Sequence, residues 1–489
     1  QILEVHPDRE VLVAGGGDHE GPHRRDGCCV SDDPAGHSRF PSVSAAGVVL
    51  VGTLIFGYAM VSRRAAGWPV SMPMVFVGAG AVLSATGALS LDSELGQVRL
   101  IAEVALAVIL FSDAVRIELR AVRRNALFPA RLLLIGLPLT IVLGTFGNWL
   151  LFPSLAFAEL ALLAAILAPT DAALGAAVVE DERVPLRERV TLNVESGLND
   201  GLVVPVVTIL TVIALEGATT GSEVMTTIVE EIGFGLLVGV IVGVVAVSVL
   251  YQAHVRGMSE GRYEQIAVFV VPFVAYAGAQ PLHGSGFISA FVAGLLFGSL
   301  GRTGFEFRWM TWLNPSTDRE QKPAIEYGEF TEDAAQLLAV AAFFLFGNVF
   351  VGEALGSYEW NVWMCAFASL TAFRIVPVWL SYVGSGRAWQ TRLFVGWFGP
   401  RGLASIVFGI VLLEDAEAFG QDFGDLFGVI TLTVTASVLL HGASAAWGAR
   451  AYGRWAERAE MDESERDDMF MIDMDASMAP PERWSRRSR

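Results

Sequence analysis

The chain has 489 residues, of which 53% are hydrophobic and only 17% charged, and its formal net charge is −18. A soluble protein carries nearer a quarter charged residues, so this composition argues against a soluble protein. The acidic balance also argues against nucleic-acid binding, which needs a basic face. Apolar residues gather in runs of about 20, the length that spans a bilayer core of about 30 Å as a helix. The sequence therefore predicts an all-α polytopic membrane protein.

Both ends of the chain differ from this apolar region. Residues 1–42 are polar and glycine-rich, and no apolar stretch precedes a cleavage site, so we expect a disordered extension rather than a signal peptide. Residues 451–489 mix acids and arginines with few apolar residues, and we expect a disordered acidic tail. A single transmembrane domain over residues 43–450 is predicted between them.

Thirteen apolar segments follow one another through this domain. They cover residues 43–62, 69–90, 98–116, 126–151, 156–178, 189–215, 225–251, 264–281, 285–301, 332–352, 361–383, 391–413 and 424–449. Loops after the odd-numbered segments carry the arginines, whereas the alternate loops carry almost none, Arg99 being the exception. Cytoplasmic loops retain Lys and Arg, so we predict an outside N-terminus and a cytoplasmic C-terminus. A miscounted segment would disturb this alternation, which supports the count.

Glycines recur at a spacing of four in two segments, at Gly235, Gly239 and Gly243 and again at Gly294 and Gly298. Small residues on one helix face let two backbones approach closely. The pattern indicates either packing inside the bundle, which we favour, or a contact between two copies of the chain.

A polar cluster in the sixth segment is the most informative feature. Glu195, Ser196, Asn199 and Asp200 lie there among apolar residues. Glu195 and Asn199 are four residues apart and share one helix face, while Ser196 and Asp200 share the adjacent face. An acid at the bilayer centre costs roughly 2.5–3.5 kcal/mol on insertion scales, so such a residue marks an ion or proton site. A carboxylate that binds either a proton or an alkali cation is sufficient for coupled exchange.

Prolines interrupt two other segments. Pro169 precedes Thr170 and Asp171 in the fifth segment, and Pro400 precedes Arg401 in the twelfth. Proline cannot donate the helical hydrogen bond, so we expect both helices to break. Unwound backbone offers carbonyl groups to a cation; Asp171 would cap the following half-helix, and Thr170 would contribute an oxygen ligand. One broken helix in each half predicts an inverted-repeat transporter with its site where they cross.

Two arginines, Arg374 and Arg401, also lie within apolar segments. Intramembrane arginines are rare and should be paired. Four acids within the segments are candidate partners: Asp113, Asp171, Glu195 and Asp200. We expect one arginine to form a structural ion pair with Glu195, and the other to neutralise the dipole of the second broken helix.

Two other functions fit these residues less well. A channel filter repeats rings of like groups around a symmetric pore, whereas these charged residues are single and dissimilar. A membrane metalloprotease needs His-Glu-x-x-His on a helix, and the histidines here are isolated. Three cysteines form neither a disulfide framework nor a metal-ligand spacing. We predict a carrier without a bound cofactor, not an enzyme.

Seven short motifs occur in order along the membrane region. They are Leu110-Phe111-Ser112-Asp113, Pro169-Thr170-Asp171, Glu195-Ser196-Gly197-Leu198-Asn199-Asp200, Leu282-His283-Gly284-Ser285-Gly286, Arg374 with Pro377, Gly399-Pro400-Arg401-Gly402 and His441-Gly442. In this order they resemble the monovalent cation/proton antiporter superfamily, in particular its NhaP-like sodium/proton exchanger branch. The resemblance covers about Ser44 to Ala449. It implies a homodimer in which a six-helix core moves as an elevator against a dimerisation domain.

The resemblance also implies roles for single residues. Asp200 would be the essential ion- and proton-binding acid, with Asp113, Thr170 and Ser196 as further Na⁺ ligands. Asn199 stands where electrogenic relatives have a second aspartate, which implies exchange of one H⁺ per cation without net charge movement.

Glu195 resembles the partner of Arg374 in a stabilising ion pair. Two features depart from the family. Ala172 follows Asp171 where the family often has proline, and the residue that matches Asp113 varies among members.

The predicted function is exchange of H⁺ for Na⁺, with Li⁺ or K⁺ as alternative ions, across a prokaryotic plasma membrane. The bilayer and the transported ions are the expected ligands, besides the second copy of the chain. A non-transporting ion or pH sensor that keeps the site without the flux is the remaining alternative.

Overall fold

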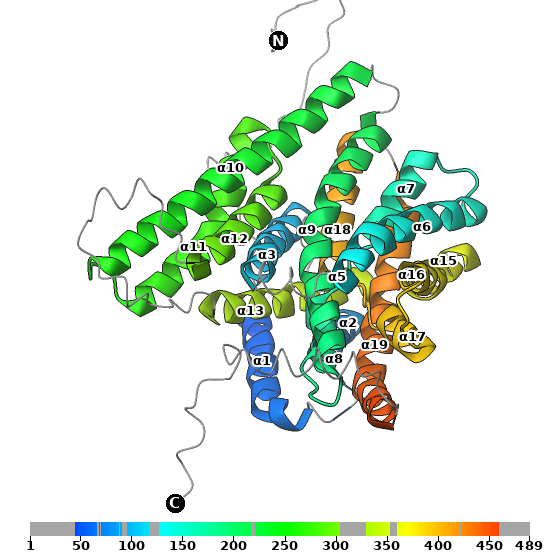
Figure 1. The fold of residues 1–489 in the computed structure, drawn as a ribbon. Helices are drawn as coiled ribbons and strands as arrows, with labels where there is room; N and C mark the ends of the chain where they lie inside the picture. Colours follow the sequence, from blue (N-terminus) through cyan, green and yellow to red (C-terminus); the bar gives the residue numbers. More distant parts are fainter. Residues whose placement is uncertain are drawn as a thin grey trace, which may run out of the picture. The chain divides into compact units, whose positions relative to one another are not determined.

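The computed structural model describes residues 45–65, 68, 70–87, 89, 95–116, 127–216, 221–303, 329–352, 359–420 and 422–458. All regular secondary structure in these ranges is helical (Figure 1). The predicted N-terminal extension and most of the predicted tail lie outside them. Residues 451–458, which the sequence placed in the tail, continue the last helix of the domain.

Each of the thirteen predicted segments coincides with one helix or with consecutive helices. The first half contains α1 (Ala45–Ala65), α2 (Met72–Ala85), α3 (Leu95–Arg116), α5 (Leu127–Arg131), the π-helix η1 (Leu132–Gly136), α6 (Leu137–Leu151), α7 (Phe157–Ile166), α8 (Ala172–Val179) and α9 (Leu186–Glu216). The second half contains α10 (Gly221–Val255), α11 (Gly261–Ala279), the 3-10 helix η2 (Gln280–Leu282), α12 (Gly286–Thr303), α13 (Glu329–Phe346), the π-helix η3 (Gly347–Val351), α15 (Trp360–Leu370), α16 (Ala372–Ser381), α17 (Trp389–Trp397), α18 (Leu403–Ala418) and α19 (Gly424–Arg458).

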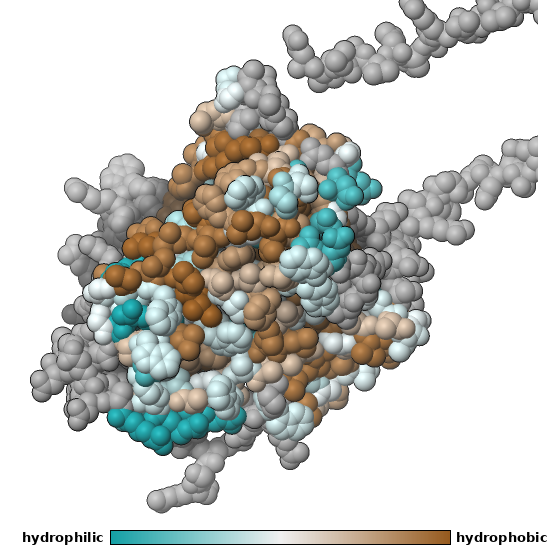
Figure 2. Space-filling view, turned by 90° about the vertical axis from the view of Figure 1, so that its right-hand side faces the viewer, coloured by the Kyte–Doolittle hydropathy of each residue, from teal (hydrophilic) through white to brown (hydrophobic). Residues whose placement is uncertain are grey.

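Seven of the described helical stretches are long and apolar enough to cross a membrane. Large apolar side chains such as Phe146 and Leu150 of α6 and Phe367 of α15 point outward. Figure 2 shows apolar surface spread over much of one face. An exposed apolar surface of this kind marks contact with lipid or protein rather than with water. The prediction of an all-α polytopic membrane protein is confirmed, while the count of thirteen crossings stays a prediction.

The glycines spaced four residues apart lie where helices pack against one another within the bundle. α10, α11 and α12 lie side by side (Figure 1), and α12 also packs on α3. A Cβ atom on Gly239 of α10 would lie 2.6 Å from the carbonyl oxygen of Ser289 in α12. A Cβ atom on Gly294 of α12 would lie 2.5 Å from the carbonyl oxygen of Phe111 in α3. Glycine therefore brings α10, α12 and α3 into backbone contact, as the preferred interpretation of the spacing predicted.

The fifth and twelfth segments are both broken. α7 ends before Pro169 and α8 starts after Asp171, while α17 ends before Pro400 and α18 starts after Gly402. The two breaks meet, because the backbone N–H of Asp171 donates to the carbonyl oxygen of Pro400 at 2.8 Å. Two interrupted helices thus cross at their unwound residues.

Replacing Gly239 with alanine is expected to destabilise the protein, because the new methyl group would collide with Ser289 and with Val292 of α12. Overpacking of this kind costs typically about 1–3 kcal/mol. Thermal unfolding in detergent micelles should therefore show a lower Tm. Gly233→Ala on the same helix is the control, since nothing lies within 4 Å of its Cβ position. Equal changes in Tm for both variants would contradict the close approach of α10 and α12.

Candidate ion-binding site

The unwound residues between α7 and α8 present a series of carbonyl groups that no helix satisfies. Side chains from α9, from α18 and from the second break satisfy them instead. Ser405 Oγ donates to the carbonyl oxygen of Ile166 (2.7 Å), Arg401 Nη1 to those of Ala168 (2.6 Å) and Pro169 (3.0 Å), and Ser196 Oγ to that of Thr170 (2.6 Å). Since buried backbone acceptors must be paired, these donors hold the break in one shape.

Arg401 lies elsewhere than the sequence suggested. We expected it to neutralise the dipole of the second broken helix, in which it lies. Its fully buried guanidinium instead reaches the first break, at the C-terminal end of α7. The physical reason is the sign of the dipole. Arg401 directly precedes α18, whose N-terminus is positive, whereas the C-terminal carbonyl groups of α7 carry partial negative charge.

Asp171 connects the two half-helices that follow the breaks. Its Oδ1 accepts a hydrogen bond from the N–H of Leu174 in α8 at 3.0 Å, and its Oδ2 accepts one from the N–H of Leu403 in α18 at 2.7 Å. A Cβ atom on Gly402 would collide with this carboxylate. Helix N-termini carry partial positive charge and free N–H groups, so one carboxylate stabilises both ends. Both oxygens of Asp171 are thus engaged in capping.

α9 faces the first break with Ser196, Asn199 and Asp200. Besides the bond from Ser196, Asn199 Nδ2 donates to the hydroxyl oxygen of Thr170 at 2.7 Å. Asn199 Oδ1 and Asp200 Oδ1 are buried and accept no hydrogen bond within the described part of the chain. Buried acceptors without a donor are rare in proteins and call for an explanation such as an ion.

Charged groups surround Asp200 unevenly. Asp113 of α3 and Asp171 act on it as acidic neighbours, and Arg401 acts on it as a basic one. Among the predicted ligands, Thr170, Ser196 and Asn199 are joined directly by hydrogen bonds. Asp113 comes from a different helix and is partly exposed. The predicted residues thus converge on one region from α3, α9 and the first break.

Glu195 and Arg374 form a two-pronged ion pair. Arg374 Nη1 and Nη2 lie 2.6 and 2.8 Å from the two carboxylate oxygens, and each side chain is 3% exposed. Arg374 follows a turn at Thr371 that separates α15 from α16, which the sequence did not predict. The guanidinium also packs on Gly399 of the second break. The pair therefore joins α9, α16 and the loop before α18.

Sequence reasoning missed a brace from α19 on the second break. Ser437 Oγ accepts the backbone N–H of Arg401 at 2.7 Å and lies 3.2 Å from His441 Nδ1. His441 Nε2 lies 2.9 Å from the carbonyl oxygen of Trp397, the last residue of α17. His441 entered the sequence analysis only within a motif, and Ser437 did not enter it. The four-residue spacing of Ser437 and His441 was the signal available.

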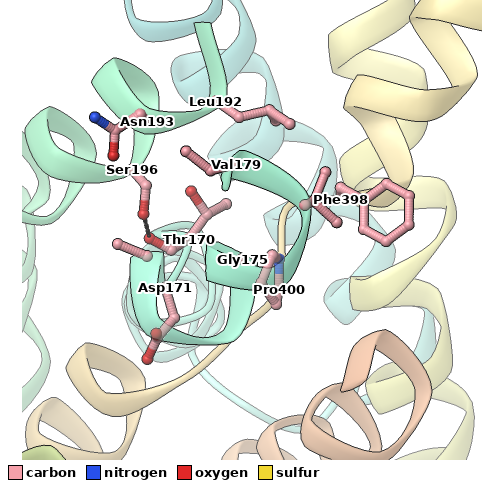
Figure 3. A pocket seen from close by; sticks show the side chains of 11 residues that line it. Thr170, Asp171, Gly175, Val179, Leu192, Asn193, Ser196, Phe398 and Pro400 are labelled. Atoms are coloured by element: carbon pink, nitrogen blue, oxygen red, sulfur yellow. Dashed lines mark hydrogen bonds between the residues drawn. The ribbon is translucent and has the colours of Figure 1, made fainter. Parts of the chain in front are cut away.

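A small cleft reaches the first break and the facing side of α9 (Figure 3). Its lining consists of Thr170, Asp171, Ala172, Gly175, Val178, Val179, Leu192, Asn193, Ser196, Phe398 and Pro400. The wall includes the last residues of α8 and an early turn of α9, so the cleft extends toward the loop that joins them. No group of three His, Cys, Asp or Glu side chains that could hold a metal ion exists among the described residues.

A family model described as "Sodium/hydrogen exchanger, transmembrane" matches residues 50–450. The chain belongs to this family. The NhaP-like resemblance is thereby confirmed, and the chain is placed among membrane transporters rather than enzymes.

Two relatives and one solved structure illustrate the similarity. The chain is 26% identical over 402 residues to the K(+)/H(+) antiporter NhaP2 of Shewanella oneidensis, with 78% of this chain and 62% of the relative covered. It is 25% identical over 336 residues to Na(+)/H(+) antiporter 2 of Zygosaccharomyces rouxii, with 61% and 39% covered. The chain thus spans less than two thirds of the length of these curated relatives.

The fold is similar to that of the sodium proton antiporter MjNhaP1 from Methanocaldococcus jannaschii, solved at pH 8. The TM-score is 0.63 at 18% identity, and the match covers 82% of this chain and 97% of the other. At this identity the likeness shows a common fold.

Replacing Glu195 with alanine is expected to lower the free energy of unfolding by about 3–5 kcal/mol, because Arg374 would stay buried without its partner. The measurement is thermal unfolding in detergent. Glu332→Ala is the control, since Glu332 pairs with Arg116 and the two side chains are 39% and 41% exposed, and surface pairs contribute little. A Glu195→Ala protein as stable as the control would contradict a structural role for the buried pair.

Replacing Asp171 with asparagine is expected to destabilise the crossing. Leu174 and Leu403 donate to different oxygens of Asp171, and in asparagine one of these positions is an NH2 group that cannot accept. One buried N–H then loses its partner, at a cost of about 1–3 kcal/mol. Tm in detergent reports the loss. Glu159→Gln is the control, because Glu159 accepts only one N–H, that of exposed Ala156, and glutamine retains that oxygen. An unchanged Tm for Asp171→Asn would exclude the shared cap.

Proposed function

We propose that the protein exchanges protons for a monovalent cation, with both ions competing for the Asp200 carboxylate. The observation that carries this proposal is a pair of buried oxygens without donors, Asp200 Oδ1 and Asn199 Oδ1. Asn199 Nδ2 donates to the Thr170 hydroxyl oxygen, and Ser196, one turn before Asp200 on α9, donates to the Thr170 carbonyl oxygen in the unwound segment. Each Thr170 oxygen retains a lone pair for a cation, and unwound backbone at a half-helix is where carriers bind Na⁺ or H⁺.

The proposed cycle needs one acid that changes its state. Glu195 is engaged with Arg374, and Asp171 is engaged with two backbone N–H groups. Asp200 retains a free oxygen, so we assign to it the alternation between a protonated form and a cation-bound form. Asn199 adds an oxygen ligand that carries no charge, and Asp113 adds negative potential from α3. One proton then leaves for each cation that binds, and the exchange moves no net charge.

Alternating access would come from a moving unit built around the crossing. The two breaks, α9 and α19 are joined by the hydrogen bonds of Asp171, Arg401, Ser196 and Ser437, so we expect them to move together. α3, α10 and α12 share close glycine contacts and would form part of the second unit. We propose elevator-type movement between these units in a homodimer of the plasma membrane, where it would serve pH and cation homeostasis. The arginine rule places the loop between α8 and α9, and hence the mouth of the cleft, in the cytoplasm.

Three cations, Na⁺, K⁺ and Li⁺, are candidates. Na⁺ is favoured by the names of the Zygosaccharomyces relative and of the archaeal antiporter, and K⁺ by that of the Shewanella relative. All three ions, including Li⁺, suit a site of hard oxygen ligands, and cavity size separates them. The flux assay below ranks them directly.

The Asp200→Asn variant is expected to abolish cation-dependent proton flux, because an amide cannot exchange a proton for a cation. Purified protein in proteoliposomes would dissipate an imposed pH gradient when Na⁺, Li⁺ or K⁺ is added, as followed by a fluorescent dye. Asp425→Asn, a change at an exposed acid of α19, is the control and should retain activity.

Valinomycin with K⁺ would clamp the membrane potential and separate electroneutral from electrogenic exchange. Equal Na⁺-dependent rates with and without the clamp would support one H⁺ per cation. Full activity of Asp200→Asn would refute the mechanism, and a wild type that responds to no cation would support a non-transporting sensor.

A further inference from the structure

Asn193 lies in the wall of the cleft, one turn before Ser196 on α9 (Figure 3). Of the eleven residues that line the cleft, four have polar side chains. Thr170, Asp171 and Ser196 belong to the site described above. Asn193 is the only exposed residue of the lining, and the proposed exchange does not yet use it.

Asn193 lies seven residues before Asp200, the essential acid of the proposed exchange, and on the same face of α9. Residues three apart are neighbours on a helix surface, and residues seven apart lie two turns along the same face. Asn193, Ser196 and Asp200 therefore form a row along α9. At 1.5 Å per residue, seven residues place Asn193 about 10 Å before Asp200 along the helix axis.

The Asn193 amide has no other evident task. It forms no hydrogen bond with any residue in the described part of the chain. The surrounding wall is apolar, formed by Val178, Val179, Leu192 and Phe398. A cation that enters between such side chains loses water ligands and gains none in return. The amide oxygen of Asn193 is the polar group of this stretch that can replace one of them.

We propose that Asn193 is the entrance ligand for the cation on the cleft side of the membrane. Its amide oxygen binds the partly dehydrated cation before Ser196, Thr170 and Asp200 take it over. An amide does not take up a proton in this pH range, so Asn193 acts on the cation and not on the competing proton. This inference rests on the proposed cation/proton exchange. It predicts that Asn193 affects the apparent cation affinity only from the side of the membrane on which the cleft opens.

The test compares the effect of cation added to either face of the membrane. Everted membrane vesicles expose the cytoplasmic face to added NaCl, or to KCl if the wild type responds only to K⁺, and right-side-out vesicles expose the other face. Asn193→Ala is expected to raise the half-saturating cation concentration about fivefold in everted vesicles, the loss of one contact of hydrogen-bond strength. The maximal rate should stay unchanged, and so should the half-saturating concentration in right-side-out vesicles. Asn361→Ala, which removes an asparagine in the first turn of α15 outside the cleft, is the matched control.

Asn193→Asp provides a second, opposite change. A carboxylate at the mouth is expected to lower the half-saturating concentration in everted vesicles at low ionic strength. Choline chloride should remove this gain, because the Debye length falls to about 3 Å at 1 M salt. A general structural defect would not produce a gain that salt abolishes.

The outcomes separate this inference from the function on which it rests. A wild type that exchanges ions, with an Asn193→Ala variant that matches it from both sides, overturns the entrance ligand and leaves the exchange intact. An equal change from both sides, or a change only in right-side-out vesicles, overturns it as well. A wild type without exchange in the proteoliposome assay refutes the proposed function itself.

Discussion

The crossing of two unwound segments is the constraint on which the rest of the structure depends. Broken helices leave N–H and C=O groups without partners inside an apolar protein, where each unpaired group is costly. Here each break supplies hydrogen-bond partners to the other. Asp171 of the first break accepts N–H groups from α8 and α18, and Arg401 of the second donates to carbonyl groups at the end of α7. Neither break would be stable alone, and this dependence explains why they meet at one point.

Each buried charge that lies at this crossing has a structural task, with one exception. Arg374 holds Glu195, Arg401 holds the end of α7, and Asp171 holds two helix starts. Asp200 lies near Asp171 and Arg401 and retains an oxygen without a donor in the described part of the chain. A carboxylate that is buried but uncommitted can gain much from a proton or a cation. In the proposed exchange, Asp200 is therefore the acid of the crossing whose charge changes.

Glycine sets a different kind of contact away from the site. In α10 and α12 the absence of a Cβ atom lets backbone meet backbone, and α12 meets α3 in the same way. Around the breaks, by contrast, long polar side chains reach across from neighbouring helices. The bundle thus combines a region of close apolar packing with a region held by directional hydrogen bonds. Asp113 belongs to the first region and Asp200 to the second, so the candidate site lies where the two regions meet.

The amino-acid pattern by itself determined the membrane class, the order of the helices, both breaks and the identity of the polar cluster. It did so because apolar run length, proline and intramembrane acids act locally, within a few residues of one another. The partner of each charge was a different matter. Arg401 was assigned to its own helix, the turn at Thr371 was not foreseen, and the brace from Ser437 and His441 went unnoticed. These contacts join residues that are distant in the chain, 232 positions apart for Asp171 and Leu403. Only the packing of the helices decides which donors face which acceptors, and the sequence carries no local signal for that geometry.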